Sequence, residues 1–117
     1  WQYKGIHRSI STVAISDEGL LFVGDFSGFI HCLDAETGKL HWVHDLKSHI
    51  WGSPMLADGK VYVGSEDGSF VVFAANKEKK VLSQIEMPAP IYSTPVVANG
   101  VLYVATTTHL YAIEQKK

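Results

Sequence analysis

Short apolar runs separated by turn residues recur three times along the chain, in the same order each time. The first run of each copy begins with a hydroxyl residue, at 12–15, 53–56 and 94–97. Second runs lie at 21–24, 61–64 and 102–105, and third runs at 29–33, 70–73 and 110–113. The runs are rich in β-branched and aromatic residues, and turns such as Asp58-Gly59 and Asn99-Gly100 bound them. This pattern predicts β-strands joined by tight hairpins.

The copies are spaced by about forty-one residues. Trp1 returns as Trp42, and the segment Ile50-Trp51-Gly52-Ser53-Pro54 returns as Ile91-Tyr92-Ser93-Thr94-Pro95. A period in the low forties filled with short strands is what one propeller blade requires. The pattern therefore predicts an all-β fold of β-propeller blades, each with four antiparallel strands, with about three blade equivalents in an incomplete ring.

The polar stretches 39–45 and 80–86 are the expected outer strands, because charged side chains are typical of an exposed sheet edge. Residues 1–4 align with 42–45 and are predicted to be an outer strand whose own blade is missing. The predicted divisions are 1–8 for this orphan strand and a linker, 9–49 for blade 1, 50–90 for blade 2, and 91–117 for a third blade lacking its outer strand.

Three blades do not close a ring, since closed propellers begin at about four blades. Two expectations follow. Either the chain is the carboxy-terminal piece of a longer propeller whose remaining blades complete the ring, or a second copy supplies them and two chains form a six-bladed ring.

Composition is that of a folded domain, with 46% hydrophobic and 19% charged residues among 117. The formal net charge of −2 and the scattered basic residues argue against nucleic acid as a partner, and no apolar run is long enough to span a membrane as a helix. The single cysteine, Cys32, excludes an intrachain disulfide and is interpreted as a small buried hydrophobe.

A turn motif precedes the second tryptophan and comprises Asp34, Thr37, Gly38 and Trp42. Asp34 and Thr37 can accept hydrogen bonds from turn amides, and Gly38 permits a left-handed corner. The large ring of Trp42 is then free to pack on a neighbouring blade. The motif resembles the tryptophan-docking motif of pyrroloquinoline-quinone (PQQ) type propeller repeats, with Cys32 where Ala is usual. In the second copy the motif is lost, because Ala74, Glu78 and Leu82 replace Asp, Gly and Trp.

The resemblance implies one of two kinds of function. Some family members are quinoprotein dehydrogenases that hold PQQ and calcium, many of them with adjacent cysteines under the quinone, a feature that one cysteine cannot form. Other members help assemble outer-membrane β-barrels, bind protein and carry no quinone. A periplasmic or other extracytoplasmic location is implied by this resemblance alone. A WD-repeat propeller is the runner-up family, although the chain has no Trp-Asp and no Gly-His pair.

Trp51 and Tyr92 occupy equivalent positions just before the first strand of their copies, where the chain enters a blade near the axial channel. His7, Arg8 and His49 fall in the same connecting loops. Together these five residues are the candidate face for a ligand or partner. The alternative is that the rings pack one blade on the next.

Other candidates are weaker. His41 and His44 point to opposite faces of a strand and do not easily share an ion, and Glu66 and Asp67 beside Gly68 fit turn chemistry better than calcium binding. We expect no catalytic residue, no metal and no cofactor, with PQQ and calcium as the alternative. The predicted function is a non-catalytic scaffold that binds protein or an extended ligand. The alternatives are a fragment of a PQQ-dependent dehydrogenase and a purely structural repeat module.

Overall fold

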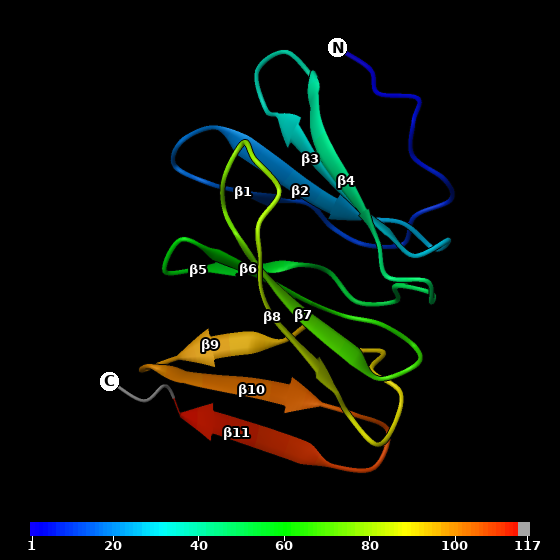
Figure 1. The fold of residues 1–117 in the computed structure, drawn as a ribbon, viewed down its shortest axis with the longest axis vertical. Coiled ribbons are helices and arrows are strands. Elements are labelled where there is room, and N and C mark those ends of the chain that lie inside the picture. The colour runs from blue at the N-terminus through cyan, green and yellow to red at the C-terminus, as the bar shows by residue number, and fades with distance from the viewer. Residues whose placement is uncertain (115–117) are drawn as a thin grey trace.

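The computed structural model describes residues 1–114 and consists of three antiparallel sheets that lie side by side in chain order (Figure 1). The first sheet contains β1 (Ala14–Ile15), β2 (Leu20–Gly24), β3 (Phe29–Asp34) and β4 (Leu40–Asp45). The second contains β5 (Met55–Ala57), β6 (Lys60–Gly64), β7 (Ser69–Ala74) and β8 (Val81–Glu86). The third contains β9 (Val96–Ala98), β10 (Val101–Ala105) and β11 (Leu110–Glu114). The predicted all-β fold of propeller blades in an unclosed ring is confirmed. Within residues 1–114 no helix has the length and apolar character needed to cross a bilayer.

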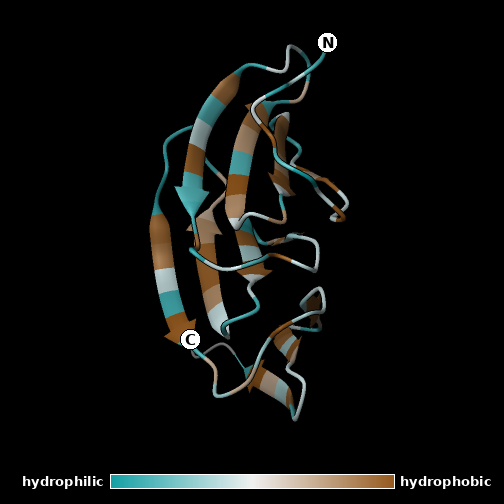
Figure 2. Cartoon of the chain, turned by 90° about the vertical axis from the view of Figure 1, so that its right-hand side faces the viewer, coloured by the Kyte–Doolittle hydropathy of each residue, from teal (hydrophilic) through white to brown (hydrophobic). Residues whose placement is uncertain are grey.

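Local sequence determines the hairpins. Asp58 and Gly59 have φ of 50° and 71°, and Asn99 and Gly100 have 51° and 76°. Two consecutive residues with positive φ are what a two-residue hairpin with the right-handed twist of its strands requires, and Asp-Gly and Asn-Gly supply them. Figure 2 shows the hydrophobic residues concentrated in the strands and the polar ones in the connections between them.

The innermost strands are shorter than predicted, because their first hydroxyl residues bond to the neighbouring blade and not to their own sheet. The backbone N–H of Thr12 donates to Oγ of Ser53, and the N–H of Ser53 donates to Oγ1 of Thr94, both at 2.8 Å. Each of these bonds spans 41 residues, one repeat. The hydroxyls therefore form a ladder that ties the three blades together along their inner edges.

Alternating side chains make both faces of a blade apolar. One face of the first sheet packs on the second sheet in a core of buried residues: Leu20, Phe22, Ile30, Cys32, Trp42, Leu46, Ile50, Val61, Val63, Val71 and Phe73. The Trp42 ring lies 5.1 Å from that of Phe73, and its indole N–H donates to the carbonyl of Asn76 at 2.9 Å. Trp42 thus joins two blades.

The junction between the second and third blades has a smaller buried core than the first junction. Its buried core contains four residues, Phe70, Val72, Ile91 and Val104. Trp42 pairs with Cys32 across β3 and β4, and in the second blade Ser83 pairs with Val72. The sequence alignment placed Leu82 at the tryptophan position, and this was wrong by one residue, because the turn between β7 and β8 is one residue longer than that between β3 and β4. The side chain in the docking position is therefore a serine.

Residues 1–4, predicted as an outer strand, form no strand in the structure. Even so, Trp1 makes a docking contact, since its indole N–H donates to the carbonyl of Ala35 at 3.0 Å. Tyr3 and Ile6 cover a second apolar patch on the outer face of the first blade, formed by Leu21, Val23 and Leu33. The segment lies against the first blade in the way that β4 lies against the second. The end of the predicted third blade, residues 115–117, lies outside the described residues.

We expect Trp42→Ala to lower the free energy of unfolding by about 3–5 kcal/mol, because a buried ring is lost and a cavity remains. Trp1→Ala should cost about 1 kcal/mol, since Trp1 is 59% exposed and makes one hydrogen bond. Urea titrations of both variants measure the difference. Equal losses would contradict the assignment of Trp42 as the principal link between blades.

Candidate functional site

One side of the three sheets is formed by the linkers that enter each blade and by the turns after each second strand, along the right of Figure 1. A hydrogen bond repeated in every blade joins linker to turn. The carbonyls of Arg8, His49 and Pro90 accept from the N–H groups of Phe26, Glu66 and Thr107 at 2.6, 2.8 and 3.0 Å. This side, the loop face, is therefore held in a fixed arrangement by the repeat.

An aromatic cluster crosses the loop face. The Phe26 and His49 rings stack with centroids 4.1 Å apart and an interplanar angle of 10°. The Phe26 and Trp51 rings meet edge to face with centroids 4.8 Å apart, and Trp51 and Tyr92 do so at 5.6 Å. The Arg8 guanidinium lies 5.0 Å from the centroid of the Phe26 ring. We call Arg8, Phe26, His49, Trp51 and Tyr92 the loop-face cluster.

The cluster is packed and accessible at once. Trp51 and Phe26 are half-buried between blades, whereas Arg8 and His49 are exposed and Tyr92 is 44% exposed. The Tyr92 hydroxyl donates to Glu66 at 3.4 Å, and the buried indole N–H of Trp51 has no hydrogen-bond partner among residues 1–114. A rigid group of rings with an exposed cation and a carboxylate is suited to binding another surface.

His7, the fifth residue predicted for this face, is not part of the loop-face cluster. Its ring stacks on Phe29 with centroids 5.7 Å apart, and its backbone N–H donates to Oδ2 of Asp25 at 3.2 Å. Its place in the cluster is taken by Phe26, which the sequence analysis did not identify. Phe26 directly follows Asp25 in a turn where the other copies have Glu66 and Thr107, so the repeat offered no aromatic signal there.

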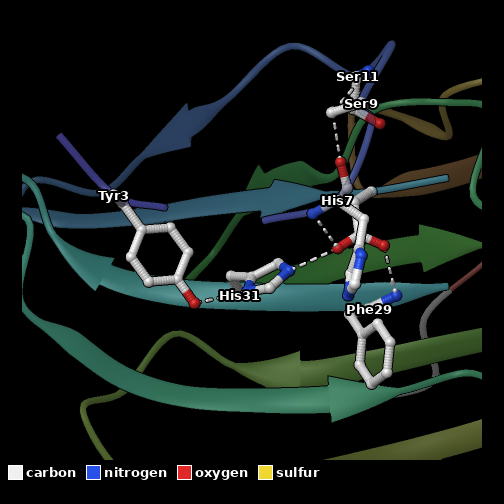
Figure 3. A network of polar contacts seen from close by, with 8 residues as sticks. Tyr3, His7, Ser9, Ser11, Phe29 and His31 are labelled. Atoms are coloured by element: carbon white, nitrogen blue, oxygen red, sulfur yellow. Dashed lines mark hydrogen bonds and ion pairs between the residues drawn. The ribbon is translucent and has the colours of Figure 1, made fainter. Parts of the chain in front are cut away.

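A buried polar network, shown in Figure 3, includes Asp25, the residue just before Phe26 of the cluster. Oδ2 of Asp25 is 2.8 Å from Nε2 of His31, and Nδ1 of His31 is 3.0 Å from the Tyr3 hydroxyl. Oδ1 of Asp25 accepts the N–H of Phe29 at 3.1 Å. Asp25 and His31 are buried, and every contact in the network is made within this blade and the segment before it. The network fixes the turn between β2 and β3 and hence the position of Phe26.

Burial alone would raise the pKa of Asp25, but the hydrogen bonds from His31, Phe29 and His7 outweigh it and hold the pKa below its ordinary value. The carboxylate is therefore ionised at neutral pH. The network has no sequence signature, because Asp25 and His31 lie six residues apart with no recognisable motif and Tyr3 joins them from 28 residues away.

The docking turn is built from local hydrogen bonds. Oδ1 of Asp34 accepts the N–H groups of Glu36 and Thr37, both at 2.9 Å, and this lowers the pKa of Asp34. Oγ1 of Thr37 accepts the N–H of Lys39 at 3.2 Å. Gly38 has a φ of 77°, and a side chain there would collide with the Trp1 ring. The motif therefore shapes the surface on which a preceding tryptophan docks.

The other candidates form no site together. Asp67 accepts from the Ser65 hydroxyl and the Ser69 N–H, which is turn chemistry, and His44 packs edge-on to Phe73. Cys32 is fully buried, and burial raises its pKa to about 12, so the thiol is not a nucleophile at neutral pH. Over residues 1–114 no three His, Cys, Asp or Glu side chains converge on a point that could hold a metal ion.

Three blades joined by a docking tryptophan and an inner hydroxyl ladder define a segment of a tryptophan-docking β-propeller. The family model described as outer membrane protein assembly factor BamB matches residues 1–81. The chain belongs to this family, which confirms the resemblance to PQQ-type repeats.

Individual proteins and solved structures are also similar to this chain. Outer membrane protein assembly factor BamB of Yersinia pestis is 35% identical over 99 residues, which cover 74% of this chain and 25% of that protein. The crystal structure of BamB from Moraxella catarrhalis matches with a TM-score of 0.74 and 21% identity over 89% of this chain and 33% of that one. Quinohemoprotein alcohol dehydrogenase ADHIIG from Pseudomonas putida HK5 matches with a TM-score of 0.75 and 22% identity over 89% and 19%.

At such identities the solved structures show the fold alone. The chain spans about a quarter of the length of the curated relatives that it matches. The sequence match therefore establishes the family. The activity and the partners of the whole protein are proposals.

Because folding lowers the pKa of Asp25, its stabilising effect is present above the ordinary aspartate pKa of 3.8 and is lost as pH falls through the folded-state value. We expect Asp25→Asn to cost about 2 kcal/mol at neutral pH and to flatten the loss of stability in acid. Urea midpoints measured from neutral pH down through this range test it, with the exposed Asp17→Asn as control. An acid profile as steep as that of the wild type would show that Asp25 does not contribute.

Proposed function

We propose that this segment is a non-catalytic, protein-binding part of a propeller that acts in outer-membrane protein assembly on the periplasmic side. The family and the Yersinia pestis relative are both described as outer membrane protein assembly factor BamB, and this description supports a role in that assembly process. The observation that carries the proposal is the loop-face cluster, which brings Trp51 and Tyr92 from two linkers into one partly exposed group.

The chemistry of the cluster suits a protein partner. Binding energy at protein interfaces is concentrated in a few Trp, Tyr and Arg residues, and rigid rings lose little conformational entropy on binding. Arg8 and His49 add donors for backbone carbonyls or carboxylates. The partner we propose is a protein of the assembly process, bound through an exposed loop or an extended segment.

Trp51→Ala and Tyr92→Ala should each weaken binding of this partner by about tenfold or more, since each truncation removes a ring from the centre of the contact. Biolayer interferometry with purified assembly proteins and an unfolded outer-membrane protein precursor measures the effect. The matched control is Tyr103→Ala, a partly exposed ring on β10 outside the cluster.

Unchanged affinity in both variants with intact circular dichroism would refute the binding role of the cluster. Loss of folding in both would assign the rings to blade packing and favour the purely structural module.

The dehydrogenase alternative has a separate test. Under this proposal, PQQ added with Ca²⁺ leaves the melting temperature and the quinone absorption spectrum unchanged, because the proposed contact is a surface for protein and requires no cofactor. A saturable rise in melting temperature at stoichiometric quinone would contradict the proposal and favour the dehydrogenase fragment.

A further inference from the structure

A cavity of about 250 Å³ lies at the junction between the second and third blades. Its wall is mostly apolar, with Tyr62, Val72, Leu102 and Ile113 among the lining residues. Ser83 also lines it, and Asp58 contributes a polar group. We call this space the junction cavity. It lies away from the loop-face cluster, since its lining comes from the strands and from the turns at the opposite ends of the sheets.

The junction cavity occupies the place that a docking tryptophan fills one blade earlier. Ser83 holds the position of Trp42, because each pairs with the equivalent residue of the third strand in its blade. At the first junction the Trp42 ring lies 6.1 Å from Phe22 and 5.1 Å from Phe73. The register of the second and third blades puts Tyr62 and Ile113 in the positions of these two rings.

The size of the space limits what can enter. An apolar protein cavity of about 150 Å³ binds benzene, and pockets for drug-sized ligands begin at about 300 Å³. A volume of about 250 Å³ therefore suits one planar bicyclic ring. The aromatic face of Tyr62 can stack on such a ring, and the Tyr62 and Ser83 hydroxyls can accept from a ring N–H.

We propose that the junction cavity is a binding site for a small planar aromatic molecule of indole size. The site arises because one repeat lost its tryptophan while the surrounding blade faces kept the shape that receives one. The proposal does not depend on the function proposed for the loop face.

The test is a titration of the isotope-labelled intact protein with indole, followed by NMR. We expect saturable shift changes at Tyr62, Leu102 and Ile113 with a Kd of about 1 mM or tighter. Ser83→Trp supplies the ring from the chain itself, as Trp42 does, and should weaken indole binding by about tenfold or more. The matched control is Gln84→Trp, which adds the same ring at the next position of β8, outside the cavity lining, and should leave the Kd unchanged.

Two results overturn the proposal. One is a wild-type titration with no shifts at the cavity, or with shifts confined to Trp51 and Tyr92, and this result does not depend on whether Ser83→Trp folds. The other is a folded Ser83→Trp variant that binds indole as tightly as the wild type.

Discussion

The indole of Trp42 joins two blades in a single contact, and much of the structure depends on contacts of this kind. Each blade is a small sheet with apolar residues on both faces, and one blade cannot bury those faces without neighbours stacked on it. The Trp42 ring is buried beside Phe73, and its N–H donates to the carbonyl of Asn76. One side chain thus covers apolar surface on both blades. Trp1 makes the corresponding hydrogen bond to Ala35, and Tyr3 and Ile6 of the same segment cover the apolar outer face of the first blade.

The fixed repeat length determines where the loop-face cluster forms. The hydroxyl ladder from Thr12 through Ser53 to Thr94 holds the inner strands one repeat apart, and the linkers just before it carry Trp51 and Tyr92 to adjacent places. The proposed binding face is thus a product of blade spacing and not of a dedicated loop. A scaffold that repeats can vary its linker side chains without changing its core.

Much of the fold follows from the sequence, because turns such as Asn99-Gly100 are decided locally and the period is visible in the order of residues. Contacts between blades were harder to predict. The turn after β7 has one extra residue, so the docking position falls on Ser83 and not on Leu82. The sequence does not show which residues of β7 and β8 pair, and that pairing sets the register. Phe26 and the network of Asp25, His31 and Tyr3 were missed because their partners meet only after folding.

The most direct measurement for the proposed role is hydrogen exchange of the protein with and without an unfolded outer-membrane protein precursor and purified assembly proteins. Binding at the loop face predicts slower exchange in linkers 46–54 and 87–95, with no change in the hairpin turns around Gly59 and Gly100 at the opposite side. Slower exchange confined to those hairpin turns would contradict the assignment of the loop face as the binding surface.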